Sequence, residues 1–366
     1  MLYCFHNERN GRLLWRAGAR RENRVRTAIY RGKRDILLTE RPLPEAGEED
    51  IVVKNLYASI CGTDVAVYFH GPGTGHKITV GEEFGHEMVS QVVQVGREVK
   101  DIRVGDRVYP YPLLAKGDPG RAGTLGGFSE YMVLPHARLY EGVYPVGEKI
   151  KTRTACLIEP FTVGMRAARR ALPKPGEKAI VFGAGTIGIA AALALRYFGC
   201  EKVMVCDLSD FRLEKARNLG LLTCNSARED LREKAMECLG TARSLSGPTA
   251  DADIFIDAAG APSILETFQS MGKIECRMVV VAVQVGKRPV DVLSMTFSQH
   301  ALIGSGGYQS EDVRDVMALM ESGRWDIDSL ITHVFAWEQL PQAIETAADV
   351  DHALNVVIDY AKQPEK

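Results

Sequence analysis

The fold class is decided by the stretch KAIVFGAGTIGIAAALAL, residues 178–195. Residues 178–183 have the continuous apolar pattern of a buried strand, and a helical pattern follows over residues 186–198. Between the two stand three glycines in the spacing G-x-G-x-x-G, namely Gly183, Gly185 and Gly188. Such a triplet is specific only when it follows a strand and opens a helix, and both conditions hold here.

This turn predicts a dinucleotide-binding site. The first glycine allows a tight turn, the second lets the backbone approach a pyrophosphate, and the third lets helix and strand pack closely. The helix N-terminus, at Thr186 and Ile187, attracts the phosphate charge. Asp207 ends the next strand-like run, 19 residues after Gly188, where a carboxylate accepts hydrogen bonds from ribose hydroxyls and repels a 2′-phosphate. We therefore predict NAD as the cofactor. NADP is less favoured, but it stays open because Arg212, five residues after Asp207, could reach toward a phosphate.

Working outward from this turn, strand and helix patterns alternate in the middle of the chain. A parallel, doubly wound sheet is predicted by a helical run at residues 210–220 and strand-like runs at residues 202–207, 253–258 and 277–283. From Val25 onward, short strand-like runs separated by Gly, Pro and Asp predict an all-β unit, a compact barrel. The tail, residues 313–360, has two amphipathic helices and a last strand and is too short to fold alone.

Composition limits the class of protein. The chain has 366 residues, enough for two domains, with 45 Lys and Arg against 47 Asp and Glu and a net charge of −2. This balance gives no sign of binding to nucleic acid or to an acidic membrane. No apolar run approaches the roughly 18 residues of a membrane helix, the start has no signal-peptide pattern, and the eight cysteines are scattered. We therefore expect a cytoplasmic protein.

A candidate metal site lies upstream of the nucleotide turn. The segments ICGTD, residues 60–64, and EEFGHE, residues 82–87, supply a thiolate from Cys61, an imidazole from His86 and a carboxylate from Glu87. A catalytic zinc takes such ligands and keeps one position open for water or substrate.

Six segments in order carry a family resemblance: CGTD at residues 61–64, GHE at 85–87, GGFSEY at 126–131, LIEPFTVG at 157–164, GAGTIG at 183–188 and ITHVF at 331–335. From about Val25 to its end, the chain resembles the zinc-dependent medium-chain alcohol dehydrogenases, and within them the sorbitol, threonine and butanediol dehydrogenase branch. The resemblance implies an α/β fold, with a GroES-like β-barrel catalytic domain and a Rossmann doubly wound parallel sheet.

The resemblance also implies site roles. Cys61 and His86 match the thiolate and imidazole zinc ligands, and Glu87 and Glu159 match two acidic positions that share or exchange the remaining coordination. Glu159 stands where ethanol-type enzymes have a second cysteine, and a carboxylate there is a harder, more exchangeable ligand. The alternative for Glu159 is an acid that only caps a helix.

Further roles follow from the same resemblance. Thr63 matches the hydroxyl that relays the substrate proton, and Asp64 matches the carboxylate that orients the ligand imidazole. Val163, Val281 and Val283 match positions beside the nicotinamide ring.

The implied domain organisation has four parts. Residues 25–164 form the first part of the catalytic domain, 165–308 the NAD-binding domain, and 309–366 a segment that completes the catalytic domain. Residues 1–24 lack periodic patterning, so we interpret them as an extension outside the core fold. The alternative is an arm that packs on a neighbouring subunit.

Two departures from the resemblance bear on function. Many relatives hold a structural zinc through four closely spaced cysteines, and this chain has none between Asp106 and Tyr131, so we expect one catalytic zinc and no structural zinc. The positions that hold His-Tyr and Arg-Tyr in sorbitol-type relatives read Ala66-Val67 and Gly307-Tyr308 here. A polyol substrate thereby loses its best support.

The sequence therefore predicts an NAD-dependent zinc alcohol dehydrogenase. It would transfer a hydride between NAD and a secondary alcohol of the polyol, sugar alcohol, diol or hydroxy amino acid type. The alternatives are a zinc-free reductase of the quinone type and a non-catalytic NAD-binding regulator. The partners we expect are a small alcohol or ketone and further copies of the chain, as a dimer or tetramer.

Overall fold

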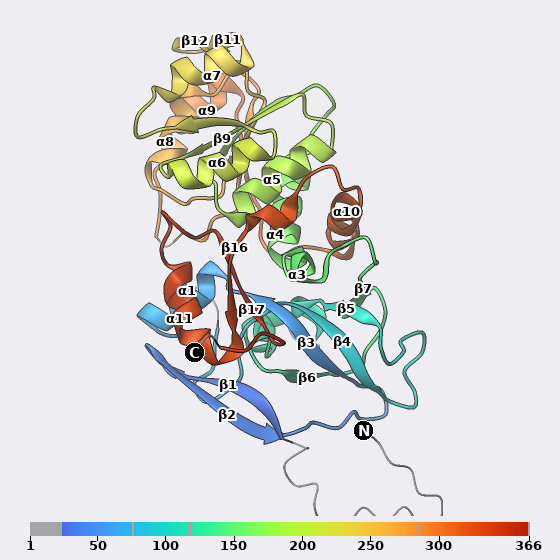
Figure 1. The fold of residues 1–366 in the computed structure, drawn as a ribbon. Helices are drawn as coiled ribbons and strands as arrows, with labels where there is room; N and C mark the ends of the chain where they lie inside the picture. The colour runs from blue at the N-terminus through green and yellow to red at the C-terminus, as the bar shows by residue number, and fades with distance from the viewer. Residues whose placement is uncertain (1–23, 75–76, 116–118, 285, 365–366) are drawn as a thin grey trace, which may run out of the picture.

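The structure is a computed structural model that describes residues 24–74, 77–115, 119–284 and 286–364. Two large sheets lie at opposite ends of the molecule, joined by a layer of helices (Figure 1). Residues 1–23, on which most of the interpreted extension falls, lie outside the described residues. The first strand begins at Arg24, one residue before the expected start.

The first sheet has six parallel strands in the order β10-β9-β8-β13-β14-β15. Their bounds are β8 Lys178–Phe182, β9 Lys202–Asp207, β10 Leu222–Asn225, β13 Ile254–Asp257, β14 Arg277–Val280 and β15 Ala301–Gly304. Ala179, Ile180 and Val181 of the central strand β8 are fully buried, because helices cover both faces of such a sheet. The predicted doubly wound sheet is confirmed.

The helices around this sheet are α5 Thr186–Tyr197, α6 Asp210–Asn218, α7 Leu231–Leu239, α8 Ser263–Met271 and α9 Val292–Ser298, with a hairpin of β11 Thr241–Ser244 and β12 Gly247–Ala250 beyond them. The predicted strand over residues 277–283 is too long. It ends at Val280, because the amides of Val281 and Ala282 both donate to the carbonyl oxygen of Asp257, at 3.0 Å. Val281 and Val283 therefore lie in the loop after the strand.

The second sheet has the strand order β16-β17-β3-β4-β5-β7, and β6 pairs with β3. Its strands are β3 Ile51–Ser59, β4 Glu87–Val95, β5 Arg107–Pro110, β6 Tyr131–Leu134, β7 Val143–Pro145, β16 Ile331–Ala336 and β17 Asn355–Asp359. A two-stranded sheet of β1 Arg24–Gly32 and β2 Asp35–Pro42 lies beside it. Since β17 pairs with β3, distant parts of the chain share one sheet.

The remaining helical elements are α1 Gly62–His70, α2 Pro112–Ala115, α3 Thr152–Ala155, α4 Ile158–Arg170, α10 Ser310–Glu321 and α11 Leu340–Ala347, with 3₁₀ turns η1 Pro119–Thr124, η2 Ile327–Leu330 and η3 Trp337–Gln339. Helix α4 packs along α5 and so links the two large sheets. Gly164 permits this contact, because a Cβ at that position would lie 2.6 Å from the Cβ of Ala190 and 2.8 Å from the carbonyl oxygen of Ile187.

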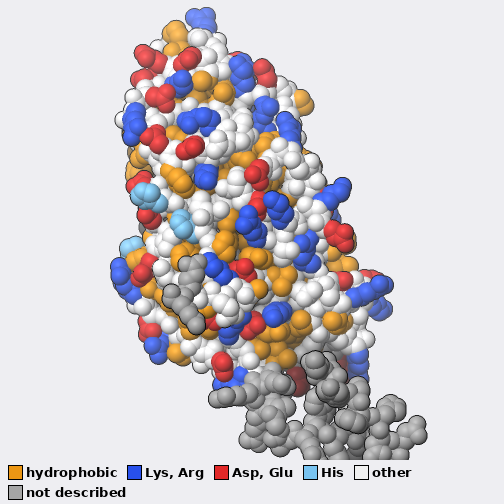
Figure 2. Space-filling model, in the orientation of Figure 1, with side chains coloured by type: hydrophobic (Ala, Val, Ile, Leu, Met, Phe, Trp, Pro, Cys, Tyr) orange, Lys and Arg blue, Asp and Glu red, His pale blue; other side chains and the backbone are white. Residues whose placement is uncertain are grey.

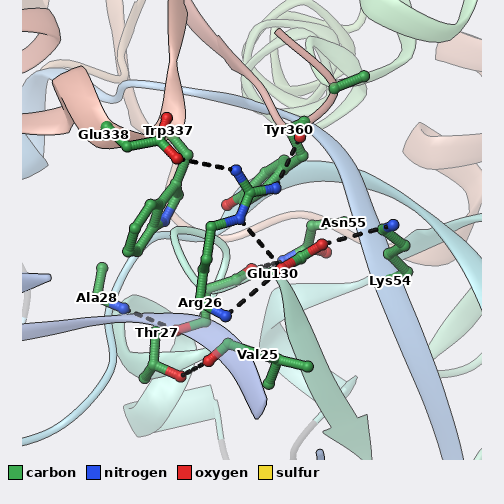
Figure 3. A network of polar contacts seen from close by, with 12 residues as sticks. Val25, Arg26, Thr27, Ala28, Lys54, Asn55, Glu130, Trp337, Glu338 and Tyr360 are labelled. Carbon is green, nitrogen blue, oxygen red and sulfur yellow. Dashed lines mark hydrogen bonds and ion pairs between the residues drawn. The ribbon is translucent and has the colours of Figure 1, made fainter. Parts of the chain in front are cut away.

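Arg26 joins the first strand to the end of the chain (Figure 3). Its Nε donates to Glu130 (3.1 Å), Nη1 donates to Glu338 (3.2 Å), and Nη2 donates to the carbonyl oxygen of Tyr360 (2.7 Å). The guanidinium also lies over the Trp337 ring, 5.5 Å from its centroid. This network holds β1 against the segments that precede β6 and follow β17.

The surface matches the balanced composition. Figure 2 shows Lys and Arg side chains interspersed with Asp and Glu over the visible face, without a broad region of one sign. None of the helices in the described ranges combines the length and the apolar character that crossing a membrane requires.

Candidate metal centre and cofactor site

The start of α1 positions the first candidate ligand. Cys61 is the N-cap residue with an extended backbone (φ −75°, ψ 149°), and its amide donates to Oδ2 of Asp64 at 3.1 Å. The Thr63 hydroxyl donates to Sγ of Cys61 at 3.1 Å. The CGTD segment therefore forms a helix cap that fixes the thiol, the hydroxyl and the carboxylate relative to one another.

His86 and Glu87 enter the centre at the start of β4. Glu87 pairs with Ser59 at the end of β3, just before Cys61. Gly85 has a φ of 91°, and a Cβ there would meet the Phe128 ring at 2.7 Å, so glycine is required for the turn into β4. One donor atom each from Cys61, His86 and Glu87 lies within 4.8 Å of the others.

The electrostatics of this group suit a cation. Burial raises the pKa of the Cys61 thiol well above its ordinary value, and the carboxylates of Glu87, Asp64 and Glu159 raise it further. Burial alone would lower the pKa of His86, but the same three carboxylates raise it. A buried thiol, an imidazole and a carboxylate form the mixed donor set that zinc accepts, and bound zinc would offset the negative charge.

Asp64 lies behind His86. Its Oδ1 is 3.8 Å from Nδ1 of His86, and both side chains are buried. Burial raises the pKa of Asp64, while the neighbouring His86 and the Cys61 amide lower it. A carboxylate at this place can orient the imidazole.

Glu159 lies close to the group but outside it. It is buried in the first turn of α4, and its Oε1 accepts a hydrogen bond of 2.7 Å from the Tyr308 hydroxyl. Burial raises the pKa of Glu159 to about 7, with a further rise from Glu87 and opposing effects of His86 and Tyr308. The structure thus brings three predicted ligands together and holds the fourth beside them.

The glycine-rich turn has the geometry expected of each glycine. Gly183 has a φ of 101°, which favours glycine, and a Cβ on Gly188 would collide with the carbonyl oxygen of Gly183. A Cβ on Gly185 would meet only Nη1 of Arg212, at 3.9 Å. The backbone at Gly185 therefore faces open space at the N-terminus of α5, which is where a phosphate can approach.

Asp207 closes this turn from β9. Its Oδ2 accepts from the amide of Ala184 at 2.6 Å, and its Oδ1 accepts from the amides of Leu208 and Ser209 at 2.7 and 2.9 Å. Arg212 is half-buried next to it, donates to the carbonyl oxygen of Ala353 at 3.3 Å, and has its pKa lowered by burial. Through the amide of Ala184, the Asp207 carboxylate is bonded directly to the glycine-rich turn.

The remaining predicted cofactor residues differ in their contacts and in their burial. Thr186 donates to Asn355 Oδ1 in β17 at 2.7 Å, and the carbonyl of Ile187 faces α4. Val163 and Val281 are partly buried against the main core, whereas Val283 is 75% exposed. His70, a second histidine close to Cys61 in the sequence, is exposed at the end of α1 and lies outside the donor group.

Sequence reasoning missed the tyrosines around Glu159. Tyr109 lies in β5, and Tyr111 directly follows that strand. Both side chains contact Tyr308, which follows β15 of the other sheet. The hydroxyls of Tyr109 and Tyr308 are 3.3 Å apart, and the Tyr111 hydroxyl donates to the carbonyl oxygen of Tyr308 at 2.6 Å. The only local signal is the spacing in YPYP at residues 109–112, which places two tyrosines on one face of an extended segment.

Two family models match this chain, one over each of its two main parts. Residues 47–144 match the alcohol dehydrogenase GroES-like domain, and residues 186–322 match the zinc-binding dehydrogenase family. L-threonine 3-dehydrogenase of Edwardsiella ictaluri (strain 93-146) is 29% identical over 347 residues, which cover 89% of this chain and 96% of that protein.

Solved structures agree on the fold. The 2R,3R-butanediol dehydrogenase from Bacillus subtilis superimposes with a TM-score of 0.80 at 24% identity, over 92% of this chain and 99% of that one. An alcohol dehydrogenase from Escherichia coli CFT073, solved in complex with NADH, gives a TM-score of 0.79 at 24% identity, over 92% and 100% of the two chains.

A donor group of this kind on a GroES-like domain, beside a parallel nucleotide-type sheet, defines a zinc-binding dehydrogenase. The chain belongs to the zinc-dependent medium-chain alcohol dehydrogenase family. It is an oxidoreductase that acts on CH–OH donors, and membership of the family implies zinc and a nicotinamide cofactor.

Proposed function

We propose that this dehydrogenase holds a single catalytic zinc per chain and oxidises a secondary alcohol, with NAD as its preferred cofactor. The observation that carries the proposal is the donor group of Cys61, His86 and Glu87, whose ligand atoms lie within 4.8 Å of one another. Helix α4 begins beside this group and packs along α5, which starts at the glycine turn. A metal and a dinucleotide would therefore share one site.

The proposed roles around the metal follow from the contacts. Cys61, His86 and Glu87 would hold the zinc, with Glu159 as an exchangeable fourth ligand and Asp64 orienting His86. Zinc, when bound, supplies Lewis-acid chemistry at an alcohol oxygen. The donor count matches a catalytic site, which keeps a position open, rather than a structural site with four fixed ligands.

Thr63 is the proposed proton relay. In this structure its hydroxyl donates to Sγ of Cys61. In the proposed relay its oxygen would accept a proton from a substrate hydroxyl and its own proton would pass on toward the cofactor ribose and solvent. Because the N-cap geometry of α1 fixes Thr63 next to the donor group, the relay requires no movement of the helix.

The glycine turn and Asp207 support NAD. Gly183, Gly185 and Gly188, followed by Thr186 and Ile187, would bind the pyrophosphate. Each oxygen of Asp207 has more than one acceptor position, so the carboxylate can bind backbone amides and still accept from a ribose hydroxyl. Its negative charge would repel a 2′-phosphate.

The nicotinamide ring would lie against Val163 on α4 and the loop of Val281 and Val283 after β14. Val163 precedes Gly164, which packs against Ile187 and Ala190 near the start of α5, and the loop follows the carboxyl end of β14. Open α/β sheets bind ligands at the carboxyl ends of their strands. The exposed side chain of Val283 is available for such a contact.

The substrate class we propose is a secondary alcohol of the diol, polyol, sugar alcohol or hydroxy amino acid type. A direct test is metal analysis of the full-length protein, together with NAD and NADP reduction measured in parallel on a panel of these compounds and cyclitols. We expect about one zinc per chain and faster turnover with NAD. Turnover without zinc would instead indicate a zinc-free reductase, and NAD binding without zinc or turnover would indicate a regulator.

We also propose that the chain forms a homo-oligomer. Strand β15 is at the edge of the six-stranded sheet, and the α9–β15 face, defined as residues 292–304, exposes Val292, Leu293, Phe297 and Leu302. An apolar face next to an open strand edge is typical of a protein interface.

A further inference from the structure

The carboxylate of Glu159 is held by a hydrogen bond rather than by its position on α4 alone. It is 7% exposed, and its Oε1 accepts from the Tyr308 hydroxyl at 2.7 Å. A hydroxyl that donates to a carboxylate forms one of the stronger kinds of hydrogen bond in proteins. The bond joins residues 149 positions apart, from α4 and from the segment after β15.

Tyr308 is itself fixed by the other sheet. Tyr111 donates to its carbonyl oxygen at 2.6 Å, the Tyr109 hydroxyl lies 3.3 Å from its hydroxyl, and the rings of Tyr111 and Tyr308 are 5.1 Å apart. Tyr308 and Tyr109 are both buried. These contacts fix the position of the Tyr308 hydroxyl, and the hydroxyl in turn determines where the carboxylate of Glu159 is held.

The held position of Glu159 lies outside the donor group. The group contains Cys61, His86 and Glu87 only, although the carboxylate of Glu159 is close enough to affect the pKa of both Cys61 and His86. A carboxylate with two stable positions, one beside the metal and one on it, is distributed between them by their difference in free energy. A hydrogen bond made only in the outer position favours that position.

We propose that Tyr308 is a positioning residue that withholds Glu159 from the zinc. The inference rests on the proposed zinc site. With Tyr308 in place, three protein ligands hold the metal and the fourth position is available to substrate. Without its hydroxyl, Glu159 ligates the metal and fills that position.

The test uses Tyr308→Phe in the full-length protein, with zinc affinity measured by chelator competition and ligand geometry measured from the visible absorption of cobalt-substituted protein. We expect zinc to dissociate with a constant about tenfold lower, because the bond that competes with ligation is gone. The cobalt spectrum should shift towards that of a site with four protein ligands.

A second variant shows whether the effect acts through Glu159. In Tyr308→Phe combined with Glu159→Gln, affinity and spectrum should return to those of Glu159→Gln alone. The matched control is Tyr144→Phe, which removes a hydroxyl of the same aromatic cluster that donates to the carbonyl oxygen of Tyr140 at 3.0 Å. It should leave the zinc affinity unchanged.

The outcomes separate this inference from the zinc site itself. Unchanged or weaker zinc binding in Tyr308→Phe overturns the positioning role, as does tighter binding that persists when Glu159 is replaced. If the unmodified protein binds no zinc, the proposed metal centre is wrong and the role of Tyr308 is wrong with it.

Discussion

Cys61 has surroundings that oppose its ionised form unless a cation is present. Its thiol is beside the carboxylates of Glu87, Asp64 and Glu159, and burial raises its pKa. The single hydroxyl that donates to it, from Thr63, only partly offsets this effect. The thiolate that a zinc ligand must provide is therefore linked to occupation of the site.

Replacing Cys61 with serine should accordingly remove most of the zinc and nearly all turnover. Serine is a much poorer zinc ligand, and two donors remain. NAD binding should be largely retained, because the glycine turn belongs to the other sheet. Metal analysis measures the zinc content, and titration with NADH, followed by its fluorescence, measures cofactor binding. The control is Cys238→Ser on α7. Full zinc content in the Cys61 variant would refute the assignment.

Asp207 should set the choice of cofactor. In Asp207→Asn the side chain keeps its size and loses its charge, so we expect a higher KM for NAD and a roughly tenfold rise in kcat/KM for NADP relative to NAD. Asp210→Asn is the matched control, since Asp210 is exposed at the start of α6 and bonds Asn225 and Arg228 instead. An unaltered cofactor ratio would show that Asp207 does not contact the ribose.

At the level of single residues, the sequence can predict which side chains lie close together where they belong to short local motifs. Cys61 with Thr63, and His86 with Glu87, are close neighbours in short motifs, and the structure brings three of these side chains into one donor group. The bond from Tyr308 to Glu159 has no such signal, because it depends on two elements from distant parts of the chain. Pairwise contacts of this kind require the tertiary structure.

At the scale of elements, the long periodic segments were the predictable ones. Strands β8 and β9 and helices α5 and α6 lie within a few residues of their predicted bounds. The four-residue strands β10 and β15 carry little periodicity, and β15 is largely exposed, so pattern alone did not identify them. Strand β14 was predicted too long, because backbone bonds to Asp257 end it.

Helix α3 and turn η2 are joined by a buried charge. Asp328 of η2 accepts from Lys151 at 3.1 Å, from Arg153 Nε at 2.6 Å and from Thr154 at 2.9 Å. These bonds, Arg153 above all, hold the pKa of Asp328 well below its ordinary value. A group whose pKa is lowered by folding stabilises the protein above its unfolded-state pKa, and this stabilisation is lost as the pH falls.

Asp328→Asn should therefore lower the free energy of unfolding by about 2 kcal/mol near pH 7. The difference from the unmodified protein should shrink as the pH falls below roughly 4, where the unfolded carboxyl is protonated. Denaturant unfolding of both proteins over a series of pH values measures this difference in the free energy of unfolding. Asp326→Asn, at an exposed neighbouring position, should have little effect at any pH. A difference that stays constant with pH would exclude the charge as the cause.

At the scale of the whole molecule, the α/β class and the pairing of a β-rich unit with a Rossmann sheet were predicted and are confirmed. The strand order of the β-rich sheet was not predictable, since β17, near the end of the chain, pairs with β3, near its start, and β16 pairs with β17. The bonds of Arg26 to Glu338 and Tyr360 show the same non-local character.

The open edge of the six-stranded sheet leads to the last prediction, that two chains pair through the α9–β15 face. A two-fold axis beside β15 would pair the strand with its own copy in antiparallel fashion, so that one surface serves both partners. The exposed Val292, Leu293 and Phe297 of α9 would be buried next to it. No other strand of that sheet in the described residues, apart from β10 at the opposite end, has a free edge.

Val292→Asp places a charge in this interface and should convert the dimer to a chain of 40.2 kDa, as measured by light scattering on a sizing column. Val104→Asp is the matched control, because Val104 is 64% exposed against 70% for Val292 and lies outside the α9–β15 face. It should leave the mass unchanged. A monomeric unmodified protein, or a dimer that survives Val292→Asp, would show that the chains do not associate through this face. Zinc content should be the same in all three proteins, since the donor group lies on the other sheet.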